Sequence, residues 1–181
     1  MKNNENLFLN TIQFPRKIAE KIEEAATTGP WWYLPDCAHP IGHELQNDTN
    51  PYFSCTIIKD RIPQPVMQNY NLSFFNKYIR MQKHTMARAH VTMHYPNPKK
   101  FGIPHNFHID QQFPHIVALY YINDADGDTI FCDEHDHSKI IHRETPKKGK
   151  CVIFEGLHTY HASSSPTKNI RMTLNINYDH L

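Results

Sequence analysis

Short runs of β-branched and aromatic residues, separated by turn sequences, follow one another from about residue 86 onwards. The runs occupy residues 86–95, 116–122, 129–131, 139–142, 151–154, 159–162 and 170–178. Between them lie Asp-Ala-Asp-Gly-Asp, Pro-Lys-Lys-Gly-Lys and Ser-Ser-Ser-Pro-Thr-Lys-Asn, whose residues favour tight turns. Many short strands joined by tight turns predict a mainly β fold with the architecture of a jelly roll.

The first 85 residues are expected to support this β core. Apolar residues recur at helical spacing between Pro15 and Gly29, which predicts one helix there, and a second helix is expected at residues 72–80. Short strands are expected at residues 31–34 and 52–58, an irregular segment at 35–51 and a frayed start. We therefore predict a single domain of residues 1–181, with a jelly-roll core at 86–179 and helices outside one sheet.

The composition indicates neither a nucleic-acid nor a membrane partner. The chain has 181 residues, a formal net charge of +1 and a mean hydropathy of -0.63, without a long basic run. No secretory signal and no stretch of about 20 apolar residues is visible, so we expect a cytoplasmic protein. Its four widely spaced cysteines are then expected to be reduced and buried: Cys37, Cys55, Cys132 and Cys151.

Histidine is unusually frequent, with 14 residues that crowd between His84 and His161. The sharpest pattern is His108-Ile109-Asp110, because residues two apart on a strand point to the same face and can converge on one ion. His161 follows about fifty residues later. Two histidines and one carboxylate on one face form the facial triad of non-haem iron(II) sites, which leaves positions open for a co-substrate and O2.

The last predicted strand opens with Arg171 and alternates strictly. Arg171, Thr173, Asn175 and Asn177 form a polar face, whereas the residues between them are apolar. Such a face is either solvated or lines a polar cavity. If it is interior, Arg171 requires an anion, because a buried guanidinium without a partner is costly. A dicarboxylate held between the metal and Arg171 would supply that anion through a bidentate pair.

Each of these features is weak by itself. His-x-Asp tripeptides occur by chance, His158 lies near His161, and an arginine on a strand is commonly solvated. The ordered set is more specific: His-x-Asp before a run of strands, one histidine in the penultimate strand, and an arginine opening the last strand. We therefore favour a metal site at His108, Asp110 and His161.

These motifs resemble the 2-oxoglutarate/Fe(II)-dependent dioxygenase superfamily, and within it the prolyl 4-hydroxylase-like branch. The resemblance covers roughly residues 86–179 and runs through MHYPNPKKFGIPHNFHID, ALYYINDADGDTIF and KKGKCVIFEGLHTYHASSSPTKNIRMTLNINY. In that branch the basic residue falls about ten positions after the distal histidine, which favours His161 over His158. The resemblance implies a double-stranded β-helix fold, iron held by His108, Asp110 and His161, and 2-oxoglutarate bound by Arg171.

Further residues correspond to the motifs of the branch. Tyr121 resembles a tyrosine that supports the distal carboxylate of 2-oxoglutarate, and Tyr95 resembles a pocket tyrosine near the iron-binding end of the co-substrate. Thr173 shares the face of Arg171 and could donate to the same carboxylate. A core position for Tyr121 and simple cavity lining for Thr173 remain alternatives.

Two segments depart from the pattern of the branch. The Gly-Gly-x-Thr turn of the branch reads Asp126-Gly127-Asp128-Thr129 here, so one of its two glycines is replaced. We therefore expect the geometry of the turn to differ, but not the chemistry of the site. The loop CDEHDHSK has no counterpart. Its His135-x-His137 pair is expected to be solvated near a cavity mouth, in preference to forming a second metal site.

The resemblance implies an enzyme that uses Fe(II), 2-oxoglutarate and O2, with ascorbate as an accessory. It would hydroxylate a substrate, in this branch a prolyl or other peptide residue, and release succinate and CO2. Nucleic-acid demethylation is disfavoured, because that branch has a second arginine where this chain has Asn177. Two alternatives stay open: a zinc hydrolase with the same three ligands, and a non-catalytic binding module on a jelly-roll scaffold.

Overall fold

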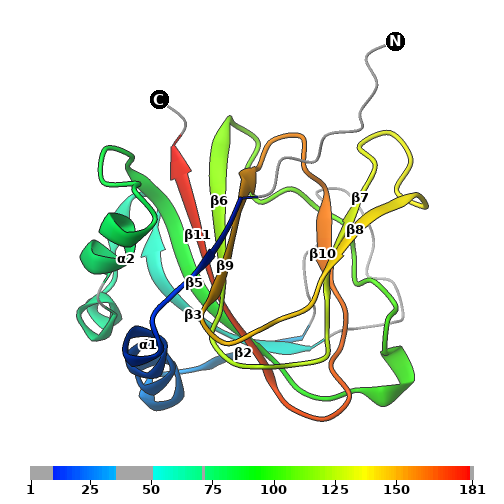
Figure 1. The fold of residues 1–181 in the computed structure, drawn as a ribbon, viewed down its shortest axis with the longest axis horizontal. Helices are drawn as coiled ribbons and strands as arrows, with labels where there is room; N and C mark the ends of the chain where they lie inside the picture. Colours follow the sequence, from blue (N-terminus) through cyan, green and yellow to red (C-terminus); the bar gives the residue numbers. More distant parts are fainter. Residues whose placement is uncertain (1–9, 36–50, 71, 180–181) are drawn as a thin grey trace.

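The computed structural model of the chain describes residues 10–35, 51–70 and 72–179. Two antiparallel sheets face each other, and both helices lie on the outer side of the larger sheet (Figure 1). This arrangement confirms the predicted jelly roll with helical support. Cys37 and most of the segment expected to be irregular lie outside the described residues. Among the described residues, no helix combines the length and apolar character needed to cross a bilayer.

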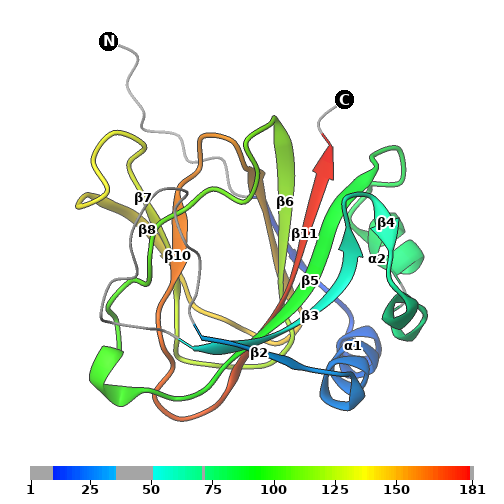
Figure 2. The same ribbon diagram turned by 180° about the vertical axis from the view of Figure 1, so that it is seen from behind.

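The larger sheet has the strand order β1-β9-β6-β11-β5-β3-β2, with β4 paired to β3 at its edge (Figure 2). All of its pairings are antiparallel. Its strands are β1 (Asn10–Gln13), β2 (Trp32–Leu34), β3 (Tyr52–Lys59), β4 (Ile62–Pro63), β5 (Met86–His94), β6 (His115–Tyr121), β9 (Lys150–Glu155) and β11 (Arg171–Asp179).

The smaller sheet has the order β10-β7-β8 and forms the opposite wall. Its strands are β7 (Thr129–Cys132), β8 (Ile140–Glu144) and β10 (His161–Ser163). The expected strand at residues 159–162 therefore begins two residues later than predicted, at His161. Between the sheets, the inward side chains of β6, β7 and β9 form a small apolar core: Val117, Leu119, Tyr121, Phe131, Val152 and Phe154.

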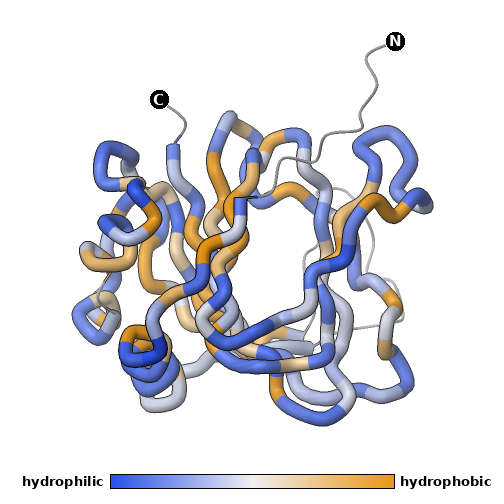
Figure 3. The backbone as a smooth tube through the Cα atoms, in the orientation of Figure 1, coloured by the Kyte–Doolittle hydropathy of each residue, from blue (hydrophilic) through white to orange (hydrophobic). Residues whose placement is uncertain are grey.

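The helices are α1 (Arg16–Thr28) and α2 (Leu72–Tyr78), with short 3-10 turns at Pro65–Asn69 and Pro98–Lys100. Helix α1 follows Pro15 and ends before Gly29, as predicted. Its buried face contains Ala19, Ile22, Ala25 and Ala26. Many of the hydrophobic residues in Figure 3 follow the strands beneath the helices, whereas the loops are mostly hydrophilic. The helices therefore cover the outer face of the sheet and leave its inner face for the site.

The N-terminal third contributes more strand than expected. Strand β1 pairs with β9, and β2, β3 and β4 extend the far edge of the same sheet. Residues before 86 are thus part of the major sheet as well as a helical support. Three of the cysteines, Cys55, Cys132 and Cys151, are buried free thiols, as predicted.

Candidate metal centre

The two histidines of the predicted triad lie directly opposite each other on neighbouring backbone segments. His108 and His161 form an isolated antiparallel bridge in which each backbone N–H donates to the carbonyl of the other at 3.0 Å. The centroids of their rings are 4.8 Å apart. Because the backbone bonds are reciprocal, the spacing of the two imidazoles is set by the fold.

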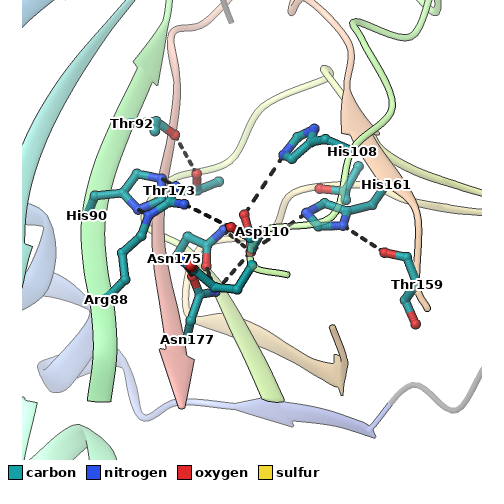
Figure 4. A network of polar contacts seen from close by, with 12 residues as sticks. Arg88, His90, Thr92, His108, Asp110, Thr159, His161, Thr173, Asn175 and Asn177 are labelled. Atoms are coloured by element: carbon teal, nitrogen blue, oxygen red, sulfur yellow. Dashed lines mark hydrogen bonds and ion pairs between the residues drawn. The ribbon is translucent and has the colours of Figure 1, made fainter. Parts of the chain in front are cut away.

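Asp110 completes the group from a bend, and here the structure differs from the prediction. Asp110 does not lie on a regular strand; the chain makes one bridge at His108 and then turns. The Asp110 carboxylate still faces both histidines, with Oδ1 3.9 Å from His108 Nε2 and Oδ2 4.0 Å from His161 Nε2 (Figure 4). The three ligand atoms lie within 4.8 Å of one another, and no other group of this kind occurs among the described residues.

Both imidazoles are oriented by backbone carbonyls. His108 Nδ1 lies 3.0 Å from the carbonyl of Asn106, and His161 Nδ1 lies 3.1 Å from that of Thr159. A carbonyl can only accept, so each Nδ1 carries the proton and each Nε2 presents its lone pair to the group. Phe154 packs edge-on against the His161 ring at 5.1 Å and limits its rotation.

Two asparagines of β11 hold the carboxylate. The Nδ2 groups of Asn175 and Asn177 both donate to Asp110 Oδ2 at 2.9 Å, which leaves Oδ1 accessible to an ion. The Asp110 side chain is only 2% exposed. Burial alone would raise the pKa of Asp110, but the neighbouring His161, Arg88 and His108 together hold it well below its usual range. The group therefore contains a carboxylate anion.

Burial lowers the pKa of two histidines that line the cavity. It lowers the pKa of His161 to about 4, with a further contribution from His108. It lowers the pKa of His90, on β5, to about 3, with a contribution from Arg88. Both rings are neutral near neutral pH, which is the form of imidazole that binds a metal.

The polar face of β11 lines a cavity of about 600 Å³ between the sheets. Arg171, Thr173 and Asn175 are buried and contribute to its wall, together with the three residues of the candidate metal group. The polar face of β11 therefore lines a polar cavity and is not solvated on the outer surface. Thr173 is tied to Thr92 across the strand pair by a 2.8 Å hydroxyl contact.

Arg171 is fixed at the start of β11. Its Nε donates to the carbonyl of Gly127 and its Nη2 to Thr129 Oγ1, both at 2.8 Å. The Tyr121 hydroxyl donates to the same Thr129 oxygen at 2.8 Å, and the guanidinium lies 5.9 Å above the Tyr121 ring. Tyr121 is thus a buried core aromatic that also braces Arg171. Burial raises the pKa of Tyr121, so its hydroxyl remains protonated.

In the Asp126-Gly127-Asp128-Thr129 turn, the one glycine allows a close approach to the segment around Ser164. A Cβ on Gly127 would lie 2.5 Å from the carbonyl oxygen of Ser164 and 2.8 Å from Pro166 N. Only glycine permits this approach of two backbones, and the approach places the Gly127 carbonyl against Arg171.

Four other residues singled out in the sequence lie outside the metal group. Tyr95 is 56% exposed, contacts Phe53 and is not among the described residues that line the cavity, so the expected pocket position is wrong. His158 is exposed and bonds to Glu134 at 2.8 Å. His135 and His137 lie in the exposed β7–β8 loop, where the His137 ring contacts Tyr160 at the cavity wall.

Four participants were not recognised from the sequence: Arg88, His90, Thr92 and Thr129. The first three alternate along β5 and face the cavity beside β11 (Figure 4). Their alternation with buried small residues in MARAHVTMH was the available signal. Arg88 donates from Nη1 to the backbone carbonyl of Asp110 at 3.3 Å.

Several solved structures superpose on most of this chain. An oxidoreductase of the 2OG-Fe(II) oxygenase family from Burkholderia pseudomallei superposes with a TM-score of 0.66 at 15% identity, over 93% of this chain and 84% of that chain. A prolyl hydroxylase from Trichoplax adhaerens, in complex with a hypoxia inducible factor peptide fragment, gives 0.63 at 13%, over 96% and 84%. The epimerase SnoN, in complex with Fe3+, alpha ketoglutarate and nogalamycin RO, gives 0.60 at 14%, over 94% and 78%.

These likenesses show that the chain has the fold of the 2-oxoglutarate/Fe(II) oxygenases. Comparison of the sequence with protein-family models and with curated proteins finds no match.

Proposed function

We propose that this chain is an Fe(II)- and 2-oxoglutarate-dependent dioxygenase that hydroxylates its substrate and releases succinate and CO2. The observation that carries the proposal is the convergence of His108, Asp110 and His161 in a cavity whose wall also contains Arg171. A zinc hydrolase would need the three ligands but not a buried arginine. The enzymes of similar fold that bind 2-oxoglutarate support the same choice.

The donor set fits Fe(II). Two Nε2 atoms and Asp110 Oδ1 are directed to one point, and the opposite atom of each group is already engaged by a carbonyl or an amide. Imidazole and carboxylate ligands suit this ion, and three protein ligands leave coordination positions for other molecules. When bound, the ion and 2-oxoglutarate supply the oxidative step, in which O2 yields the hydroxylated substrate, succinate and CO2.

The chain supplies position and environment for this chemistry. We assign the distal carboxylate of 2-oxoglutarate to Arg171, with Thr173 as a neighbouring donor; the contacts of Thr129 with Arg171 and Tyr121, and the position of Arg171 in the cavity wall, support this. Asn175 and Asn177 keep the Asp110 carboxylate in one orientation. The walls of the jelly roll bury the Asp110 and His161 side chains, which strengthens their charged contacts.

The substrate is proposed to be a small molecule or a peptide, with no nucleic acid or membrane involved. One protein of similar fold is in complex with a peptide and another with nogalamycin RO. We also propose a cytoplasmic location, which the free thiols of Cys55, Cys132 and Cys151 support.

Metal content and co-substrate binding test this proposal. Protein purified without oxygen should contain iron in preference to zinc, and the Fe(II) form should bind 2-oxoglutarate in a calorimetric titration. Arg171→Gln should weaken that binding, whereas Arg16→Gln, on the outer helix α1, should not. Zinc occupancy together with an absence of 2-oxoglutarate binding would favour the hydrolase instead.

A further inference from the structure

The cavity contains a second arginine, at the end opposite to Arg171. In the pairing of β5 with β11, Arg171 lies opposite His94 and Asn177 lies opposite Arg88. The two arginines are therefore separated by six positions of paired strand, roughly 20 Å of backbone. Asp110 is held at the Asn177 end, so Arg88 lies beside the candidate metal group, away from the proposed 2-oxoglutarate carboxylate site (Figure 4).

The contacts of Arg88 leave much of its guanidinium unused. Nε and Nη2 lie 3.2 Å from the two ring nitrogens of His90, and Nη1 donates to the Asp110 carbonyl. A neutral imidazole has one acceptor nitrogen, so at most one of the two His90 contacts is a hydrogen bond. Among the described residues, no carboxylate side chain accepts a hydrogen bond from Arg88. Most of its N–H donors are thus available to a ligand in the cavity.

The charged residues of the cavity indicate whether that ligand is an anion or a cation. Of the described residues in its wall, Asp110 is the only acid, and Arg88 and Arg171 are the two arginines. A divalent ion and doubly charged 2-oxoglutarate neutralise each other, and Asp110 offsets one arginine. One positive charge remains, in a half-enclosed site where an unpaired guanidinium favours a carboxylate or phosphate.

We infer that Arg88 binds an oxyanion of the primary substrate, a carboxylate or a phosphate, and so directs the enzyme to anionic substrates. The assignment of this anion to the substrate depends on the proposed function, whereas the anion site itself does not. An oxyanion at Arg88 would hold the substrate beside Asp110, next to the coordination positions that the three protein ligands leave open.

Matched small probes test the inference on the protein loaded with Fe(II) and saturated with 2-oxoglutarate, without oxygen. Phenyl phosphate, benzoate and neutral benzamide are titrated calorimetrically. At least one oxyanion should bind about tenfold more tightly than benzamide, the effect of a charged hydrogen bond. The preferred oxyanion identifies the source, phosphate or carboxylate. Saturating 2-oxoglutarate prevents the probes from binding at Arg171.

Three variants assign the preference to a residue. Arg88→Met, which keeps an unbranched apolar stem but removes the charge and the N–H donors, should remove the oxyanion preference. Arg88→Lys should retain part of it, and Arg16→Met, far from the cavity, should keep all of it. A wild-type protein without preference, or an Arg88→Met protein that keeps it, would overturn the inference. Benzamide binding in each variant reports whether the cavity is intact.

The titration of 2-oxoglutarate in the same samples separates this inference from the proposed function. An oxyanion preference that Arg88→Met removes, without 2-oxoglutarate binding, would reject the oxygenase and leave the Arg88 site standing. 2-Oxoglutarate binding without oxyanion preference would reject the Arg88 site alone.

Discussion

Asn177 donates its side-chain amide to Asp110 Oδ2 at 2.9 Å, from a strand 67 residues further along the chain. Asn175 donates to the same oxygen and also accepts a hydrogen bond from Asn177, so the three side chains form one closed set. Position 177 is where the resemblance places a second arginine in nucleic-acid demethylases. Here an amide at this position orients a proposed metal ligand.

Asn177→Ala should therefore weaken metal binding more than it weakens the fold. Loss of an outer partner of a ligand typically lowers metal affinity by roughly 10- to 100-fold. Competition between the protein and a chelator of known Fe(II) affinity measures the change. Asn169→Ala, in an exposed turn, is the control and should leave the affinity unchanged. Equal affinities in both variants would remove Asn177 from the support of Asp110.

Arg171→Lys should raise the KM for 2-oxoglutarate, because a lysine keeps the charge but loses the planar pair of donors. Hydrogen bonds to charged groups contribute about 1.5–3 kcal/mol, so an increase of roughly 10- to 100-fold is expected. Initial rates of succinate formation at varied 2-oxoglutarate give KM and kcat separately. A variant with an unchanged KM would place the distal carboxylate elsewhere.

Gly127→Ala should destabilise the protein by about 1–3 kcal/mol, because the added methyl group forces two backbones apart. The nearest atom to the new Cβ would be Ser164 O at 2.5 Å. Gly102→Ala is a useful comparison, since its φ of +71° is strained for alanine but nothing lies within 4 Å. Urea unfolding should show the larger loss for Gly127→Ala, and a larger loss at Gly102 would contradict the packing argument.

Acid should destabilise the metal-free protein through His161. Burial and His108 lower the pKa of His161 from 6.5 to about 4 in the folded state. Between these pH values the unfolded chain binds a proton that the folded chain does not, so the free energy of unfolding decreases as the pH is lowered. The full effect is on the order of 3 kcal/mol for this residue.

Urea unfolding of the metal-free protein at a series of pH values measures this loss. His161→Asn should flatten the decline between about pH 6.5 and pH 4. His158→Asn should not, because Glu134 raises the pKa of the exposed His158. The same slope in the wild type and in His161→Asn would show that His161 is not the group responsible.

The sequence allowed the strands after residue 86 to be predicted because turn residues separate them and their apolar residues alternate. Strands β1 and β4 were missed because they are short, mostly exposed edge strands without a distinctive pattern. The candidate metal ligands His108, Asp110 and His161, together with Arg171, could be predicted from a sequence motif. The partners of Asp110 could not, because cross-strand register decides which of Asn175, Asn177 and Arg88 reaches it.

Tyr95 is a residue for which the motif predicted a position in the cavity that the structure does not show. Its sequence context resembles that of a pocket tyrosine, but β5 ends at His94 and the next side chain lies on the exposed surface against Phe53. A single position at the end of a strand reverses the face of a side chain, and the tripeptide around Tyr95 does not reveal where the strand ends.

The most direct test of the proposed oxygenase is Fe(II)-dependent conversion of 2-oxoglutarate to succinate in the presence of O2. The wild-type protein should form succinate with Fe(II) and ascorbate but not with Zn(II), and Asp110→Ala should abolish the reaction. Succinate formation that is equal in the wild type and in Asp110→Ala would contradict the account.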